Sequence, residues 1–205
     1  MANGKYNDIY RRLGRRFAYL DSKYPRDRLI IEIAHEFTGS WYEHSVYGVV
    51  NSVPAWQKFG LAYDRIVENI RKGYYEVAKK NCPYLFWVRP ARSNISKNVW
   101  LDSHRPSLES FDGIGLSQHD NLSNSCTPDN PRINWSRQNG SFEGLVNIAD
   151  MAKQWGKYIG FFEWSSHHPD AGWASGKRPD LFTRSMWDFF NQYSDNLLGE
   201  TYFLS

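Results

Sequence analysis

Two glutamates of this chain are best placed to do chemistry, because each follows a short apolar segment and has a tryptophan close behind it. Glu36 comes after the largely apolar residues 29–34, and Glu163 ends the apolar run 158–162 with Trp164 beside it. Glycoside hydrolysis needs two carboxyl groups, one protonated and one ionised, flanking the bond that breaks. An aromatic ring next to such a pair suits the C–H face of a sugar. The pattern therefore favours a carbohydrate-cleaving site.

The two apolar segments have the length and composition of buried β-strands. Residues 29–34 are rich in isoleucine, and both segments are too short for a helix. In α/β proteins, active sites lie at the carboxyl ends of parallel strands. For the first segment alone, the alternative is that Glu36 is a solvated strand-end residue and Trp41 a core residue. The second strand end with a glutamate and a tryptophan favours the catalytic interpretation.

Helices and strands alternate along the rest of the chain. Apolar spacing predicts helices at 7–24, 54–80, 142–155 and 180–193, and strands at 29–35, 84–88, 111–117, 158–162 and 199–204. This alternation predicts an α/β protein with a parallel sheet covered by helices. A length of 205 residues fits one domain, residues 1–205.

The composition narrows the classes of function. A net charge of +3 is too small to indicate nucleic-acid binding, and no basic run alternates with aromatic residues. Two cysteines, Cys82 and Cys126, indicate neither a disulfide framework nor a zinc site. The sequence has no glycine-rich phosphate loop, signal peptide or membrane-spanning apolar run, so we expect no cofactor and no membrane partner. The aromatic content of 17%, much of it at predicted strand ends, suits saccharide binding.

Five segments together resemble glycoside hydrolase family 26, best known for β-mannanases on (β/α)8 barrels. They are NGKYNDIYRRLGRRFA at 3–18, HEFTGSWY at 35–42, YLFWVRP at 84–90, FDGIGLSQHD at 111–120 and FFEW at 161–164. Their order and separation match the family from its third helix to its eighth strand. The resemblance implies a TIM-type (β/α)8 barrel that lacks its N-terminal part, with about five of the eight βα units present.

The resemblance also implies roles for single residues. Glu36 would be the general acid/base and Glu163 the nucleophile of a retaining glycosidase that cleaves a β-linked polysaccharide, mannan by the family's default. His35 and Trp41 would hold the sugar at the cleavage point. Further residues expected to contact the polysaccharide or oligosaccharide substrate are His119, Trp164 and Trp173.

Three positions depart from the family's pattern. Thr38 stands where asparagine is common, and His119 takes the place of a tyrosine that usually contacts the nucleophile. Glu32 stands where arginine is common, and a buried glutamate needs a cationic partner; Arg89 is the candidate. These departures leave the two catalytic carboxyl groups in place, and they bear on which sugar is bound.

Length is the largest departure. A (β/α)8 barrel takes about 250 residues, and segments matching its first three strands are absent from these 205 residues. An open sheet would expose two unpaired edges. Three explanations are open: a truncated gene or misassigned start at Met1, a barrel completed by another chain, and a stable half-barrel. A missing N-terminal segment with a signal peptide would make the protein extracellular or periplasmic.

Other classes of function fit the sequence less well. A metal site built from His119, His167, His168 and Asp170 has no supporting spacing, because adjacent histidines on an extended chain point in different directions. A glycan-binding protein without turnover would keep the aromatic residues but not the chemistry. An unrelated flavodoxin-like protein would explain the order of strands and helices, but not the two strand ends with a glutamate and a tryptophan.

Overall fold

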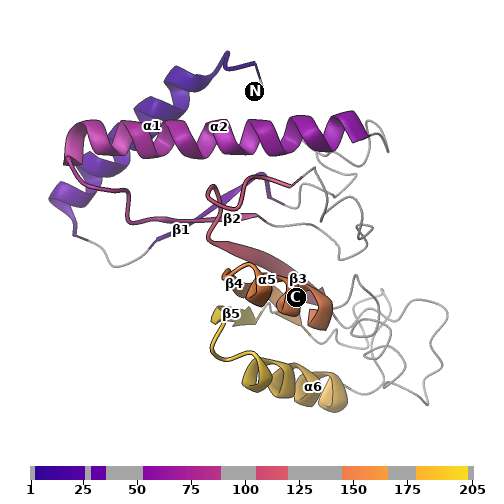
Figure 1. The fold of residues 1–205 in the computed structure, drawn as a ribbon. Coiled ribbons are helices and arrows are strands. Elements are labelled where there is room, and N and C mark those ends of the chain that lie inside the picture. The colour runs from indigo at the N-terminus through magenta and orange to yellow at the C-terminus, as the bar shows by residue number, and fades with distance from the viewer. Residues whose placement is uncertain are drawn as a thin grey trace, which may run out of the picture. The chain divides into compact units, whose positions relative to one another are not determined.

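The computed structural model of this chain describes residues 3–25, 29–35, 53–88, 105–119, 145–165 and 179–202, and the structural statements below concern these residues. They form, in chain order, α1 (Asn7–Lys23), β1 (Ile30–Ile33), α2 (Val53–Ala78), β2 (Leu85–Val88), β3 (Gly113–His119), α5 (Leu145–Gln154), β4 (Tyr158–Ser165), α6 (Pro179–Gln192) and β5 (Leu197–Tyr202) (Figure 1).

The strands form one sheet in the hydrogen-bonded order β1-β2-β3-β4-β5. The pairs β1–β2 and β4–β5 are parallel, as expected where a helix separates consecutive strands. The predicted α/β class and parallel sheet are therefore confirmed, and all nine described elements coincide with predicted ones. No helix in the described part of the chain is long and apolar enough to cross a membrane.

Contacts within the chain define two compact units. The first contains the described residues up to Val88 together with 105–113, and the second contains those from Ile114 onward. Each unit is described by itself below. The expectation of a single domain over residues 1–205 stays a prediction.

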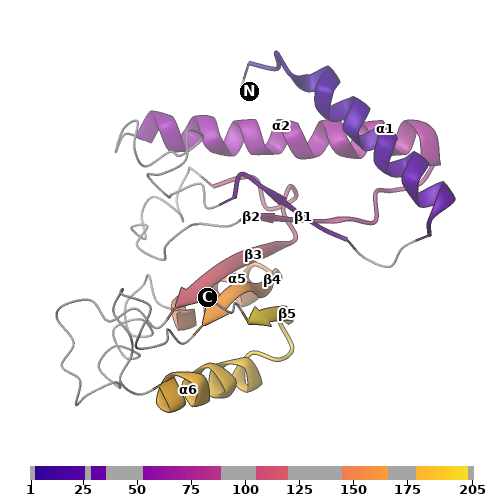
Figure 2. The same cartoon turned by 180° about the vertical axis from the view of Figure 1, so that it is seen from behind.

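The first unit is built on a close crossing of two helices, seen from both sides in Figures 1 and 2. A Cβ atom added to Gly14 of α1 would lie 2.0 Å from the carbonyl oxygen of Ile70, and one added to Gly73 of α2 would lie 1.9 Å from that of Arg11. Neither backbone position could hold a side chain without a shift of the helices. Glycine inside a helix costs about 1 kcal/mol relative to alanine, and here it permits the contact between the two backbones.

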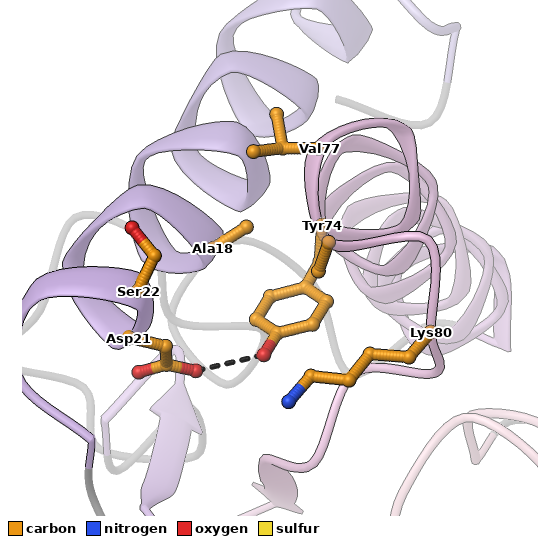
Figure 3. Close-up of a pocket in the computed structure, with 7 residues that line it drawn as sticks. Ala18, Asp21, Ser22, Tyr74, Val77 and Lys80 are labelled. Atoms are coloured by element: carbon orange, nitrogen blue, oxygen red, sulfur yellow. Dashed lines mark hydrogen bonds between the residues drawn. The ribbon is translucent and has the colours of Figure 1, made fainter.

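A carboxylate joins α1 to the rest of this unit. Asp21 accepts a hydrogen bond from the Tyr74 hydroxyl at 2.8 Å (Figure 3) and another from the Tyr84 hydroxyl. Burial, together with the bond to Asp21, raises the pKa of Tyr74 to about 12, and the same causes raise the pKa of Tyr84. A pocket of about 320 Å³ beside this carboxylate is lined by Ala18, Asp21, Ser22, Tyr74, Val77, Ala78 and Lys80.

Strand β2 forms the apolar centre of the same unit. Phe86 and Trp87 are fully buried. Gly113, the first residue of β3, lies so close to the Trp87 indole that an added Cβ would be 2.6 Å from it. Asp112 fixes this approach twice, since its side chain accepts a bond from the Phe86 N–H at 2.9 Å and its own N–H donates to the Phe86 carbonyl at 2.7 Å.

The second unit packs an aromatic cluster between β4 and α6. Phe161 meets Phe189 and Phe190 edge to face, with ring centroids 5.6 and 5.2 Å apart. Tyr193 donates a hydrogen bond to Asp150 of α5 at 2.9 Å, and burial followed by this bond raises the pKa of Tyr193 to about 12. Gly156, at φ +65°, follows α5 and ends that helix in the left-handed conformation that suits glycine.

Candidate active site

The described end of β1 places a carboxylate and an imidazole together. Ile33 is the last buried residue of the strand, and Ala34 then adopts φ 56°, a left-handed conformation that is uncommon for residues other than glycine. The turn brings His35 Nδ1 to 2.8 Å from Glu32 Oε1. The side chains of His35 and Glu32 are 40% and 21% exposed, so their contact is partly screened by solvent. Left-handed alanines are held by their surroundings and gather at functional sites.

The expected cationic partner of Glu32 was Arg89, which lies outside the described residues, so that pairing stays a prediction. The structure gives this carboxylate His35 as a partner, three residues along the chain, and leaves it partly exposed. Sequence spacing alone missed the pair because strand alternation does not bring residues i and i+3 together; the left-handed turn at Ala34 intervenes here.

Strand β4 carries Glu163 within a β-bulge. Phe161 pairs with Glu200 of β5, and Trp164 pairs with Tyr202. Between these two pairs β4 advances by three residues and β5 by two, so β4 holds one extra residue. The extra residue turns Phe161 and Trp164 to the same face, where both rings contact Phe190 of α6. Glu163 lies between them in the bulge and is half-buried. Bulges re-aim side chains and are frequent next to active sites.

The expectation that Trp164 offers an exposed ring face to a sugar is wrong in this structure. Trp164 is only 4% exposed, and its ring lies edge to face on Phe190 at 5.5 Å. Its indole N–H donates a hydrogen bond to Glu200 Oε2. The residue therefore ties β4 to β5 and to α6 immediately after Glu163. Sequence reasoning missed Glu200, whose only signal was a carboxylate inside a predicted last strand.

The remaining expected site residues fall partly or wholly outside the described residues. His119 is the last residue of β3, and only its backbone placement is described. Glu36, Trp41 and Trp173 lie outside the described ranges, so the expected pairing of Glu36 with Glu163 stays a prediction. Among the residues that are described, no cluster of three histidine, cysteine, aspartate or glutamate side chains could hold a metal ion.

This chain matches known proteins by its fold but not by its sequence. No protein-family model and no curated protein matches the sequence. Solved structures do match: an endo-β-1,4-mannanase of Cellulomonas fimi from glycoside hydrolase family 26 aligns with a TM-score of 0.61 and 20% identity over 96% of this chain. GH26C from Muricauda sp. aligns over 98% of the chain, with a TM-score of 0.65 and 15% identity.

A fungal β-1,4-galactanase aligns as well, with a TM-score of 0.55 and 15% identity over 98% of the chain. The fold is therefore that of barrel-type glycoside hydrolases, and the resemblance to family 26 is confirmed at the level of the fold. The chain spans 41% of the Cellulomonas fimi mannanase, 50% of the Muricauda protein and 59% of the galactanase. It thus carries about half of the architecture of these proteins.

Proposed function

We propose that this chain provides the catalytic part of a retaining glycoside hydrolase that acts on β-linked polysaccharide of the mannan type. The observation that carries the proposal is the placement of Glu163 on the fold of glycoside hydrolases. It is half-buried in a bulge of the parallel strand β4, and the next residue, Trp164, bonds to β5 and packs on α6. One of these neighbours, the Cellulomonas fimi protein, is an endo-β-1,4-mannanase, which supports mannan as the first substrate to test.

In the proposed reaction, Glu163 attacks the anomeric carbon while Glu36 donates its proton to the glycosidic oxygen that leaves. The bond between the sugar and the leaving group breaks as the bond to the Glu163 oxygen forms. Glu36, now ionised, takes a proton from water, and the water oxygen displaces Glu163 from the sugar. Two displacements retain the anomeric configuration, which requires carboxyl groups roughly 5–5.5 Å apart.

The environment of Glu163 suits a nucleophile. A nucleophile must be held within bonding reach of the anomeric carbon, and misplacement by about 1 Å can cost on the order of 100-fold in rate. The ring packing of Trp164 on Phe190 and its bond to Glu200 fix the strand directly after the nucleophile. Trp164 is therefore proposed as a positioning residue and not as a stacking surface for sugar.

The other predicted site residues take binding roles in this proposal. His35, oriented by Glu32 at 2.8 Å, would donate or accept a hydrogen bond to a sugar hydroxyl. Trp41 and Trp173 would offer ring faces to neighbouring sugars. His119, at the end of β3, would contact either the substrate or the nucleophile.

A glycan-binding protein without turnover is the second candidate. It is favoured by one observation, that the chain spans only 41–50% of the family 26 structures it matches. Such a protein would use the same aromatic residues for binding, and Glu36 and Glu163 would have no catalytic role.

The test uses the 205-residue chain alone and the same chain joined to the part of the Cellulomonas fimi mannanase that it does not cover. Each form is incubated with linear β-mannan and glucomannan, and reducing ends are measured, with the Glu163→Gln variant as the control. Release that depends on Glu163 is the expected result. Binding without release in both forms would favour the second candidate, and neither binding nor release would overturn both.

A further inference from the structure

The pocket between the last turns of α1 and α2 has no role in the chemistry proposed above (Figure 3). Its volume is about 320 Å³, at the lower end of the range of about 300–1,000 Å³ that small-molecule sites occupy. Helix α1 leads into β1 and α2 leads into β2, so the pocket lies on the side where these two parallel strands begin. His35 follows the other end of β1. The pocket is therefore separate from the polar residues at the carboxyl end of that strand.

Asp21 presents hydrogen-bond acceptors to this pocket. Its Oδ2 accepts a hydrogen bond from the Tyr74 hydroxyl at 2.8 Å, and its Oδ1 accepts one from the Tyr84 hydroxyl. A carboxylate has about four acceptor positions, so about two are left after these bonds. The two tyrosines hold the carboxylate in place, and its remaining acceptor positions can serve a ligand.

Lys80 presents donors to the same space. Figure 3 shows its ammonium group pointing toward the part of the pocket where Asp21 and the Tyr74 hydroxyl meet. The ion pairs between described residues do not include Asp21 with Lys80. An ammonium group has three donors and no acceptor. A carboxylate and an ammonium group thus line one pocket without pairing with each other.

Much of the remaining wall is aliphatic. Ala18, Val77 and Ala78 supply it, and Val77 is 49% exposed. The formal charges of Asp21 and Lys80 cancel. An anion would meet Asp21 and the negative ends of two helix dipoles, while a cation would meet Lys80. A neutral molecule with adjacent donor and acceptor groups and an apolar face fits this set of side chains best.

We propose that this pocket binds a neutral sugar unit through two adjacent hydroxyl groups. One hydroxyl would donate to Asp21, the next would accept from Lys80, and the C–H face of the ring would lie against Val77. Each hydroxyl of a sugar is both a donor and an acceptor, so a neighbouring pair can serve a carboxylate and an ammonium group at once. The proposal rests on the pocket and holds whether or not Glu163 is catalytic.

The main test follows the backbone amide signals of the 205-residue chain by NMR while methyl β-mannoside is added. The amides of Ser22, Val77 and Lys80 should shift together and reach a plateau. The compound 2-methoxytetrahydropyran has the same ring without hydroxyl groups and should cause no such shift. Acetate and methylammonium, which probe a charged ligand, should not bring these amides to a plateau either. No plateau with the mannoside, or equal shifts with any of the other three compounds, would overturn the proposal.

Substitutions at two neighbouring lysines test whether the pocket is responsible. Lys80→Ala should weaken binding of methyl β-mannoside by roughly tenfold, the usual contribution of one hydrogen bond to a charged group. Lys80→Arg keeps a cationic donor and should retain most of the affinity. Lys79→Ala removes an exposed lysine that does not line the pocket, and it should leave the affinity unchanged.

Two results with these variants would overturn the proposal. One is an unchanged affinity in Lys80→Ala. The other is an equal loss in Lys80→Ala and Lys79→Ala, because it would assign the effect to surface charge and not to the pocket. Release of reducing ends that depends on Glu163 is a separate readout, so failure of sugar binding at this pocket and failure of the proposed catalysis are distinguishable.

Discussion

The ends of β1 and β4 hold their polar residues by different means. At β1, the pair of Glu32 and His35 is local, three residues apart and 21–40% exposed, and it depends on one left-handed residue, Ala34. At β4, the contacts beside Glu163 come from other elements: Trp164, the next residue, bonds to Glu200 of β5 and packs on Phe190 of α6. A nucleophile needs fixed placement, and a residue that only binds a sugar hydroxyl tolerates a looser one. The difference agrees with the nucleophile role we propose for Glu163 and the binding role we propose for His35.

The largest expected effect is at the end of β4. Glu163→Gln should lower kcat by more than about 10⁴-fold on both natural polysaccharide and aryl glycosides, because no glycosyl-enzyme can form. The assay is release of reducing ends or of the aryl group by the form that is active on mannan. Glu68→Gln, which removes an exposed ion pair with Lys72 on α2, is the matched control and should keep full activity. Comparable losses in both variants would point to a general defect in folding.

A smaller and substrate-dependent loss is expected at the end of β1. Glu36→Gln should slow hydrolysis of polysaccharide by roughly 10²–10⁴-fold, the usual contribution of general acid–base catalysis. With aryl glycosides that carry good leaving groups, the first step should survive and a burst of released aryl group should precede slow turnover. Equal losses on the two substrate types would remove the proposed contrast between the strand ends.

The contacts that position Glu163 can be weakened by a substitution that leaves its carboxylate unchanged. Trp164→Phe keeps a ring against Phe190 and removes the indole N–H that bonds to Glu200. It should lower the free energy of unfolding by about 0.5–1.5 kcal/mol, the net worth of one hydrogen bond. If the indole positions β4, kcat should fall while KM stays constant. A rise in KM alone would mean that Trp164 contacts sugar after all.

The smallest effect is expected from the local pair at β1. Glu32→Ala removes the acceptor that orients His35 and breaks a partly exposed pair, so stability should change by only about 0–1 kcal/mol. KM should rise and kcat should change little, because His35 is assigned to binding. Glu32→Gln keeps an acceptor oxygen and should restore most of the lost affinity. No rescue by glutamine would show that charge, and not orientation, is what Glu32 provides.

The sequence was sufficient for the order of the elements, because apolar spacing and glycine positions decide it. The strand ends were less exact: β4 was predicted to end at residue 162 and ends at Ser165, so Glu163 lies inside the strand. The sequence could not show the bulge in β4. Strict alternation places Phe161 and Trp164 on opposite faces, and one extra residue reverses that, which buried the tryptophan expected to stack on sugar. Gly14 and Gly73 did carry a signal that the sequence interpretation did not use. Two glycines inside long predicted helices indicate a close helix crossing, which the structure shows.

Azide rescue tests the assignment of the two glutamates most directly. With an aryl glycoside as substrate, azide should restore the rate of the Glu36→Gln variant by attacking the covalent intermediate, and the product should be a glycosyl azide of retained configuration. Azide added to the Glu163→Gln variant should attack the substrate itself and give the inverted product. The opposite pattern of configurations would show that the two roles are exchanged. No azide adduct from either variant would contradict the proposed pair.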